Sequence, residues 1–66
     1  MIIILNGERF QVEDGCTVSD LLKKMELHPS GVAVEHNRHI VRKADYDGMI
    51  LKEDDAVEIV HFVGGG

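Results

Sequence analysis

The pattern of apolar and polar positions opens with two strand-length runs on either side of a turn signal. Residues 1–5 (MIIIL) and 8–12 (ERFQV) flank the pair Asn6-Gly7. Both turn residues tolerate the positive φ angles of a two-residue type I′ turn, whose twist matches that of paired strands. The pattern therefore predicts a β-hairpin at the start of the chain.

A helical pattern follows the hairpin. Its apolar residues recur at every third or fourth position, as one face of a helix requires: Val18, Leu21, Leu22 and Met25. Thr17 stands directly before them and can cap the helix, and Asp20 lies in the first turn, where the helix dipole favours a negative charge. Asp20 is also one turn from Lys24, so these two side chains can pair. We predict one helix with a single apolar face.

Helix-breaking residues separate this helix from a second predicted hairpin. Pro29 and Gly31 end the helix. Residues 32–36 (VAVEH) and 39–41 (HIV) are rich in β-branched residues and flank a turn at Asn37. We therefore predict two further short strands.

The last third of the chain contains an irregular segment and then a longer strand. Residues 42–51 have no sustained period, which predicts turns with one short helical turn. Residues 56–63 first alternate and then become apolar on both sides at Val60 and Phe62. This pattern is typical of a strand that is covered on both faces or is central in its sheet.

The order of predicted elements is ββαββ, which places the chain in the α+β class. A helix with one apolar face must pack across one face of a sheet, here a mixed sheet of four to five strands. A last strand lying beside the first would be parallel to it, as the long connection permits. This is the β-grasp, or ubiquitin-like, arrangement. We expect residues 1–63 to form this domain and residues 64–66 to form a flexible glycine tail.

Composition and charge narrow the class of protein. The 66 residues are 44% hydrophobic, enough for the core of one globular domain, and carry a formal net charge of -5. This acidic balance disfavours nucleic acid as a partner. The chain shows no signal peptide and no apolar run of the length that a membrane span needs, so we expect a cytoplasmic protein without a membrane partner.

Several side chains suggest metal or thiol chemistry, and each has a simpler interpretation. His36, His39 and His61 are too few for a zinc site, which usually has four donors, so we expect exposed histidines and no metal. Cys16 has no nearby histidine and is expected to be an inert packing residue. The acidic run 53–55 lacks the ligand spacing of a calcium loop and is expected to be a solvated turn. No nucleophile and base stand together, so we do not expect an enzyme.

The chain resembles the sulfur carrier proteins of thiamine (thiazole) biosynthesis, a ubiquitin-like family, over essentially its whole length. The resemblance rests on segments that arrive in order: the Asn6-Gly7 hairpin, TVSDLLKKM (17–25), GVAVEHN (31–37), KEDD (52–55) and FVGGG (62–66). Two positions depart from the family, which commonly has glycine where this chain has Arg38 and Asp54. Aspartate visits the left-handed region readily, whereas Arg38 makes a tight turn less certain.

The resemblance implies that the carboxylate of Gly66 is the working group, presented on Gly64 and Gly65. Three extended residues span about 10 Å, which lets this group enter a partner's active site. An ionised carboxylate is a poor electrophile and must be activated. In the family, an E1-like adenylating enzyme consumes ATP to form an acyl-adenylate. A sulfur donor such as a cysteine desulfurase then replaces AMP, and the resulting thiocarboxylate supplies sulfur to thiazole synthase.

The resemblance therefore implies a substrate of enzymes, with no bound cofactor. Phe62 and Val63 are expected to dock partners, with Phe62 partly exposed, and Glu58 and Asp55 to steer their approach from the rim. Two alternatives stay open. The chain can be a carrier for another pathway, chiefly the small subunit of molybdopterin synthase, or a ubiquitin-like modifier that forms isopeptide bonds.

Overall fold

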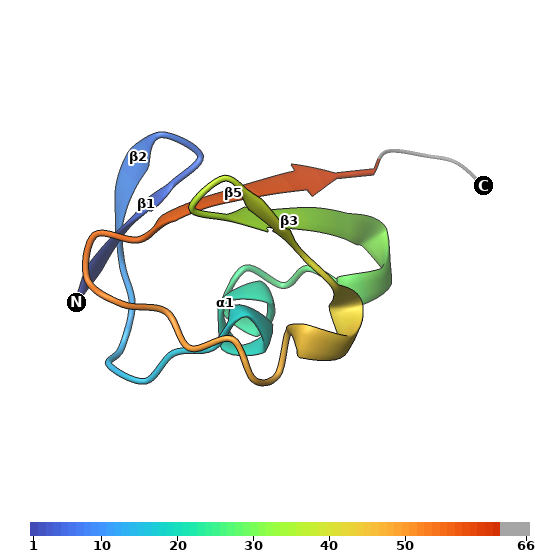
Figure 1. Cartoon of the computed structure of the whole chain (residues 1–66), viewed down its shortest axis with the longest axis horizontal. Helices are drawn as coiled ribbons and strands as arrows, with labels where there is room; N and C mark the ends of the chain where they lie inside the picture. The colour runs from blue at the N-terminus through green and yellow to red at the C-terminus, as the bar shows by residue number, and fades with distance from the viewer. Residues whose placement is uncertain (63–66) are drawn as a thin grey trace.

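A mixed five-stranded sheet carries the fold, with one helix packed across one of its faces (Figure 1). The computed structural model describes residues 1–62. The elements are β1 (Ile2–Leu5), β2 (Glu8–Gln11), α1 (Val18–Lys24), the 3₁₀ turn η1 (Pro29–Gly31), β3 (Val32–His36), β4 (His39–Val41), the 3₁₀ turn η2 (Lys43–Asp45) and β5 (Ala56–His61). The predicted mixed sheet with one helix is confirmed, and its five strands lie within the predicted four to five, but the order is ββαβββ, with one strand more after the helix than the predicted ββαββ. The short helical turn predicted in the irregular segment is present as η2.

The last strand lies in the middle of the sheet, whose order is β2-β1-β5-β3-β4. It runs parallel to β1, with Leu5 opposite Val57, and antiparallel to β3, with Val32 opposite His61. The parallel pairing of first and last strands is the arrangement expected from the sequence. It gives β5 neighbours on both sides and thereby determines where the end of that strand lies.

Both predicted hairpins close through residues with positive φ. Asn6 and Gly7 have φ of 49° and 84°, and Asn37 and Arg38 have φ of 49° and 73°. Arg38 therefore completes a tight turn although it lacks the freedom of glycine. Asp54 also has a positive φ, 67°, so both departures from the resembling family keep the left-handed backbone that glycine favours.

The helix begins with a capping box, as the sequence suggests. The backbone N–H of Asp20 donates to the Thr17 hydroxyl, and the backbone N–H of Thr17 donates to the Asp20 carboxylate, both at 3.1 Å. These bonds from Thr17 lower the pKa of Asp20 from its ordinary value. The expected pair between Asp20 and Lys24 is not among the ion pairs of residues 1–62, because the carboxylate serves the cap instead.

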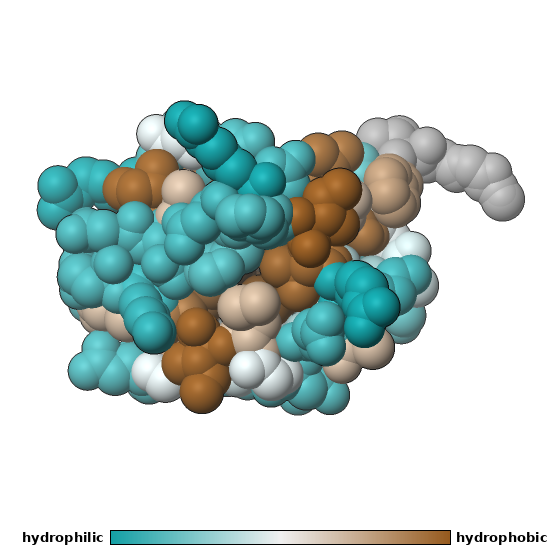
Figure 2. All heavy atoms as spheres, viewed as in Figure 1, coloured by the Kyte–Doolittle hydropathy of each residue, from teal (hydrophilic) through white to brown (hydrophobic). Residues whose placement is uncertain are grey.

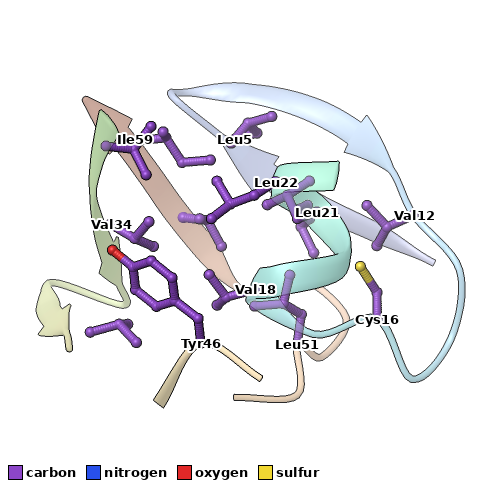
Figure 3. Close-up of a cluster of buried hydrophobic side chains, with 14 residues drawn as sticks. Leu5, Val12, Cys16, Val18, Leu21, Leu22, Val34, Tyr46, Leu51 and Ile59 are labelled. Carbon is purple, nitrogen blue, oxygen red and sulfur yellow. The ribbon is translucent and has the colours of Figure 1, made fainter. Parts of the chain in front are cut away.

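One hydrophobic core fills the space between the helix and the sheet (Figure 3). It comprises Ile3, Leu5, Val12, Cys16, Val18, Leu21, Leu22, Val32, Val34, Val41, Tyr46, Leu51, Val57 and Ile59. Cys16 is buried in this core, which confirms that it is a packing residue, and burial raises the pKa of its thiol. Tyr46 and Leu51 come from the segment without a period, so only the structure identifies them as core.

Within residues 1–62 no helix is long and apolar enough to cross a bilayer, and α1 has seven residues. Its three buried residues, Val18, Leu21 and Leu22, are used by the core.

Candidate functional site

Phe62, which was predicted to dock partners, directly follows the last residue of β5. The backbone N–H of Phe62 donates to the carbonyl of Gly31 at 2.9 Å, so the sheet pairing holds this residue just beyond the strand. Its side chain is 58% exposed, which confirms the expected partial exposure. Four other predicted positions, Val63, Gly64, Gly65 and Gly66, lie outside the described residues.

Among residues 1–62, the helix covers one face of the sheet and no element covers the other, which we call the open face. Along β5, Val57 and Ile59 point into the core, whereas Ala56, Glu58 and Val60 are exposed. Successive strand residues point to opposite faces, and the single helix covers only one of them. Of the two interpretations of the apolar strand end, the central position is therefore confirmed, and coverage on both faces is wrong, since Val60 is 59% exposed.

Three exposed apolar side chains on this face form a surface that we call the open-face patch: Ile40, Val60 and Phe62. Ile40 of β4 is 77% exposed and lies opposite Glu35, whose side chain shares the exposed face of β3. Strand alternation places Phe62 on the same face as Val60. In Figure 2, apolar side chains gather over the C-terminal half of β5 and the β3–β4 hairpin, amid a mostly hydrophilic surface.

A pair of carboxylates accompanies the patch. Glu58 of β5 lies directly opposite Glu35 of β3, and both residues are exposed. Like charges directly opposite each other across a sheet are destabilising, on the scale of roughly 0.2–1 kcal/mol. A cationic group docked between them relieves this repulsion. Glu35 and Ile40 were not predicted as site residues. The predicted hairpin of residues 32–41 can set them opposite each other, but only the pairing of β3 with β5 brings them beside Glu58.

Asp55 has a different environment from the one expected. Its carboxylate accepts from Nε2 of His36 at 2.7 Å, from the backbone N–H of Lys52 at 2.8 Å and from Nδ2 of Asn37 at 3.1 Å. Only 12% of its side chain is exposed, so the prediction of a solvated turn is wrong at this residue. Burial is the largest influence on its pKa and raises it, yet the hydrogen bonds from His36, Lys52 and Asn37 together outweigh it, so the pKa is lowered.

This network joins the β3–β4 turn to the start of β5, at the opposite end of the strand from Phe62. Asp55 is therefore a structural anchor there, and little of its charge is accessible to a partner. Whether it steers partners, as the sequence suggested, stays a prediction. Of the two charges predicted to steer partners, Glu58 is the more accessible, because it is exposed on the open face.

The histidines do not form a metal site within residues 1–62. No group of three potential ligands comes together there. His39 and His61 are exposed, as expected. His36 is not, because its side chain is 19% exposed and held by Asp55, so the prediction of an exposed turn histidine is wrong for this residue.

The fold and the site together define a class. A mixed sheet with parallel first and last strands, one helix across one face and an apolar surface at the end of the central strand is the β-grasp, or ubiquitin-like, architecture. The sequence model of the ThiS family matches residues 3–66. The chain belongs to this family, and the resemblance found in the sequence is confirmed.

Individual proteins with similar sequences or structures also support this family assignment. The chain is 43% identical over 63 residues to the sulfur carrier protein ThiS of Bacillus subtilis, covering 94% of this chain and 96% of that protein. It is 46% identical over 66 residues to a thiazole synthase of Magnetococcus marinus, but spans only 20% of that protein's length. The crystal structure of the thiamine biosynthesis protein ThiS from Geobacter metallireducens superposes with a TM-score of 0.81 at 30% identity, over the whole of both chains.

Proposed function

We propose that this protein is a sulfur carrier of thiamine biosynthesis, whose Gly66 carboxylate becomes a thiocarboxylate that supplies the sulfur of the thiazole ring. The observation that carries this proposal is the near full-length match to the Bacillus subtilis sulfur carrier, on a fold shared with another thiamine biosynthesis protein. In this role the chain is a substrate that enzymes load and unload, and it catalyses no step itself.

The chemistry follows from the electronic state of the carboxylate. An ionised carboxylate resists nucleophilic attack, because attack adds negative charge to an anion. Adenylation removes this obstacle: a carboxylate oxygen attacks the α-phosphorus of ATP, pyrophosphate leaves, and the acyl carbon gains AMP as a leaving group. A hydrosulfide equivalent from the sulfur donor then attacks that carbon, AMP departs, and a nucleophilic thiocarboxylate remains. ATP is thus consumed at the adenylating enzyme's site, and the carrier holds no cofactor.

Thiazole synthase is the proposed acceptor of the sulfur. In two proteins named thiazole synthase, from Magnetococcus marinus and Paramagnetospirillum magneticum, one fifth of the length aligns with the whole of this chain, at 46% and 38% identity. A carrier segment within a synthase polypeptide supports the two acting in sequence. An E1-like adenylating enzyme and a sulfur donor such as a cysteine desulfurase complete the proposed set of partners.

We propose that the open-face patch and the Glu35–Glu58 pair dock the adenylating enzyme. Apolar side chains at the centre of an interface supply most of its affinity, and charges at the rim direct approach. The partner surface that fits is apolar at its centre and basic at its edge. Phe62 is four residues before Gly66 in the sequence, so a partner that docks on this patch is close along the chain to the proposed reacting carboxylate.

Reconstitution tests this function. The protein is incubated with the cognate adenylating enzyme, ATP and sulfide, and intact-mass spectrometry is used to look for the mass gain of replacing one oxygen by sulfur, localised to Gly66 by peptide mapping. A variant lacking Gly66 is the matched control. Thiazole formation with this protein as the sole carrier then tests the pathway. Appearance of lysine-linked conjugates in cell extract with ATP, without thiocarboxylate, would instead support a protein modifier.

A further inference from the structure

The side chain of Asn6 is bonded to the central strand far away in the sequence. Its Oδ1 accepts from the backbone N–H of Ile59 at 2.8 Å, and its Nδ2 donates to the carbonyl of Ile59 at 3.3 Å. The backbone N–H of Asn6 also donates to the carbonyl of Val57 at 2.9 Å. The side-chain amide therefore takes the place of the next peptide group in the β1–β5 ladder.

The bonds from the Asn6 side chain are important because β1 ends before β5 does. The last paired residues of the two strands are Leu5 and Val57, whereas β5 continues to His61. Within residues 1–62 no strand pairs with 58–61 on the β1 side. Asn6 holds this stretch at Ile59 from that side, and β3 holds it from the other.

Asn37 makes an equivalent clamp at the opposite end of the same strand. Its Oδ1 accepts from the backbone N–H of Ala56 at 2.9 Å, and its own N–H donates to the carbonyl of Ala56 at 2.7 Å. Both asparagines have a φ of 49° in the first position of a hairpin turn. The two asparagines thus share their backbone geometry and a side-chain oxygen that accepts from β5. They differ in the end of β5 that they hold and in Nδ2, which donates to Ile59 in Asn6 and to Asp55 in Asn37.

We propose that Asn6 is a positioning residue: by fixing Ile59, it sets the position of the end of β5 and of Phe62, from which the chain continues toward the C-terminal carboxylate. The proposal rests on the proposed function, because position matters only if the C-terminal carboxylate must meet an active site. Reactions between held groups are sensitive to displacements of about 1 Å, which can cost up to ~100-fold in rate. The Asn6 side chain can therefore affect the reaction through its bonds to Ile59.

The experiment compares Asn6→Gly with Asn37→Gly. Glycine accepts the positive φ of both turns, so each variant loses side-chain bonds while keeping its turn. In the free protein, amide exchange at Ile59 should accelerate about tenfold in Asn6→Gly, as expected for losing a hydrogen bond, and stay unchanged in Asn37→Gly. With the cognate adenylating enzyme, ATP–pyrophosphate exchange should show kcat lowered about tenfold and KM changed less than about twofold for Asn6→Gly. Asn37→Gly should keep both constants.

A second variant, Asn6→Asp, keeps the test decisive if Asn6→Gly fails to fold. Asn6→Asp tolerates the left-handed backbone and retains an oxygen for the N–H of Ile59, so it should give an intermediate kcat. Wild-type kcat in folded Asn6→Gly, or equal losses in the two glycine variants, would overturn the proposal. If the wild-type protein is not adenylated, the proposed function is wrong. If the amide hydrogen exchange of Ile59 is unchanged in Asn6→Gly, the Asn6 side chain does not hold Ile59, whatever the outcome for adenylation.

Discussion

Truncation of Phe62 to alanine tests whether the open-face patch is a docking surface. The side chain is 58% exposed at the end of β5, so most of it is free for a partner to cover. Phe62→Ala should therefore weaken binding to the adenylating enzyme while leaving the fold in place.

The magnitude follows from the exposed area. A phenylalanine side chain presents roughly 150–250 Å², so an exposed fraction of 58% leaves roughly 90–150 Å² to bury. At about 25 cal/mol per Å² this is about 2–4 kcal/mol. Since the alanine methyl keeps part of that area, we expect a loss of about 2–3 kcal/mol, or roughly 30- to 150-fold in Kd. A loss of this size is typical of an interface hot spot.

Surface plasmon resonance at two ionic strengths measures the effect. Phe62→Ala should act mainly by faster dissociation, at both salt concentrations. Glu58→Gln should act mainly by slower association, and its effect should fade as salt rises. The matched control is Ile50→Ala, because Ile50 is 57% exposed but pairs with Thr17 at the start of the helix, away from the open face.

Circular dichroism must first show that each variant is folded. If folded Phe62→Ala binds as tightly as wild type, or if Ile50→Ala weakens binding equally, the docking assignment is wrong. The partner surface would then have to be sought away from the end of β5.

Three further predictions concern the tail, the core and pH. Deleting Gly65 and Gly66 should leave thermal melting unchanged, since glycine has no side chain to contribute to a hydrophobic core, and should abolish sulfur transfer; a large fall in Tm would contradict this. Leu22→Asp should unfold the domain in circular dichroism, because Leu22 is 1% exposed and burying an unpaired charge costs several kcal/mol against a stability of roughly 3–10 kcal/mol. The lowered pKa of Asp55 gives stability that is present above the unfolded-state pKa of about 3.9 and is lost as pH falls through the lower folded-state value. Melting temperature in acid should therefore depend less on pH in Asp55→Asn, and an unchanged dependence would refute this role.

The helix and strands could be predicted from the sequence, because the signals for them are local. A turn at Asn6-Gly7, a cap at Thr17 and the spacing of Leu21 and Leu22 each depend on residues a few positions apart. The same signals arranged in order predicted the β-grasp fold and the family. The partial exposure of Phe62 was also predictable, from its place after the last alternating residues.

The residues that surround the site could not be predicted in this way, because they meet through long-range contacts. Periodicity shows that Val60 and Ile59 point to opposite faces, but not that the single helix leaves one face open. Asn6 and Asn37 were predictable as turn residues, whereas their bonds to Ile59 and Ala56 join positions 53 and 19 residues apart. Asp55 likewise finds His36 across 19 residues. Such contacts exist only once the chain has brought β5 between the two hairpins, since no local pattern encodes which distant backbone group a side chain will meet.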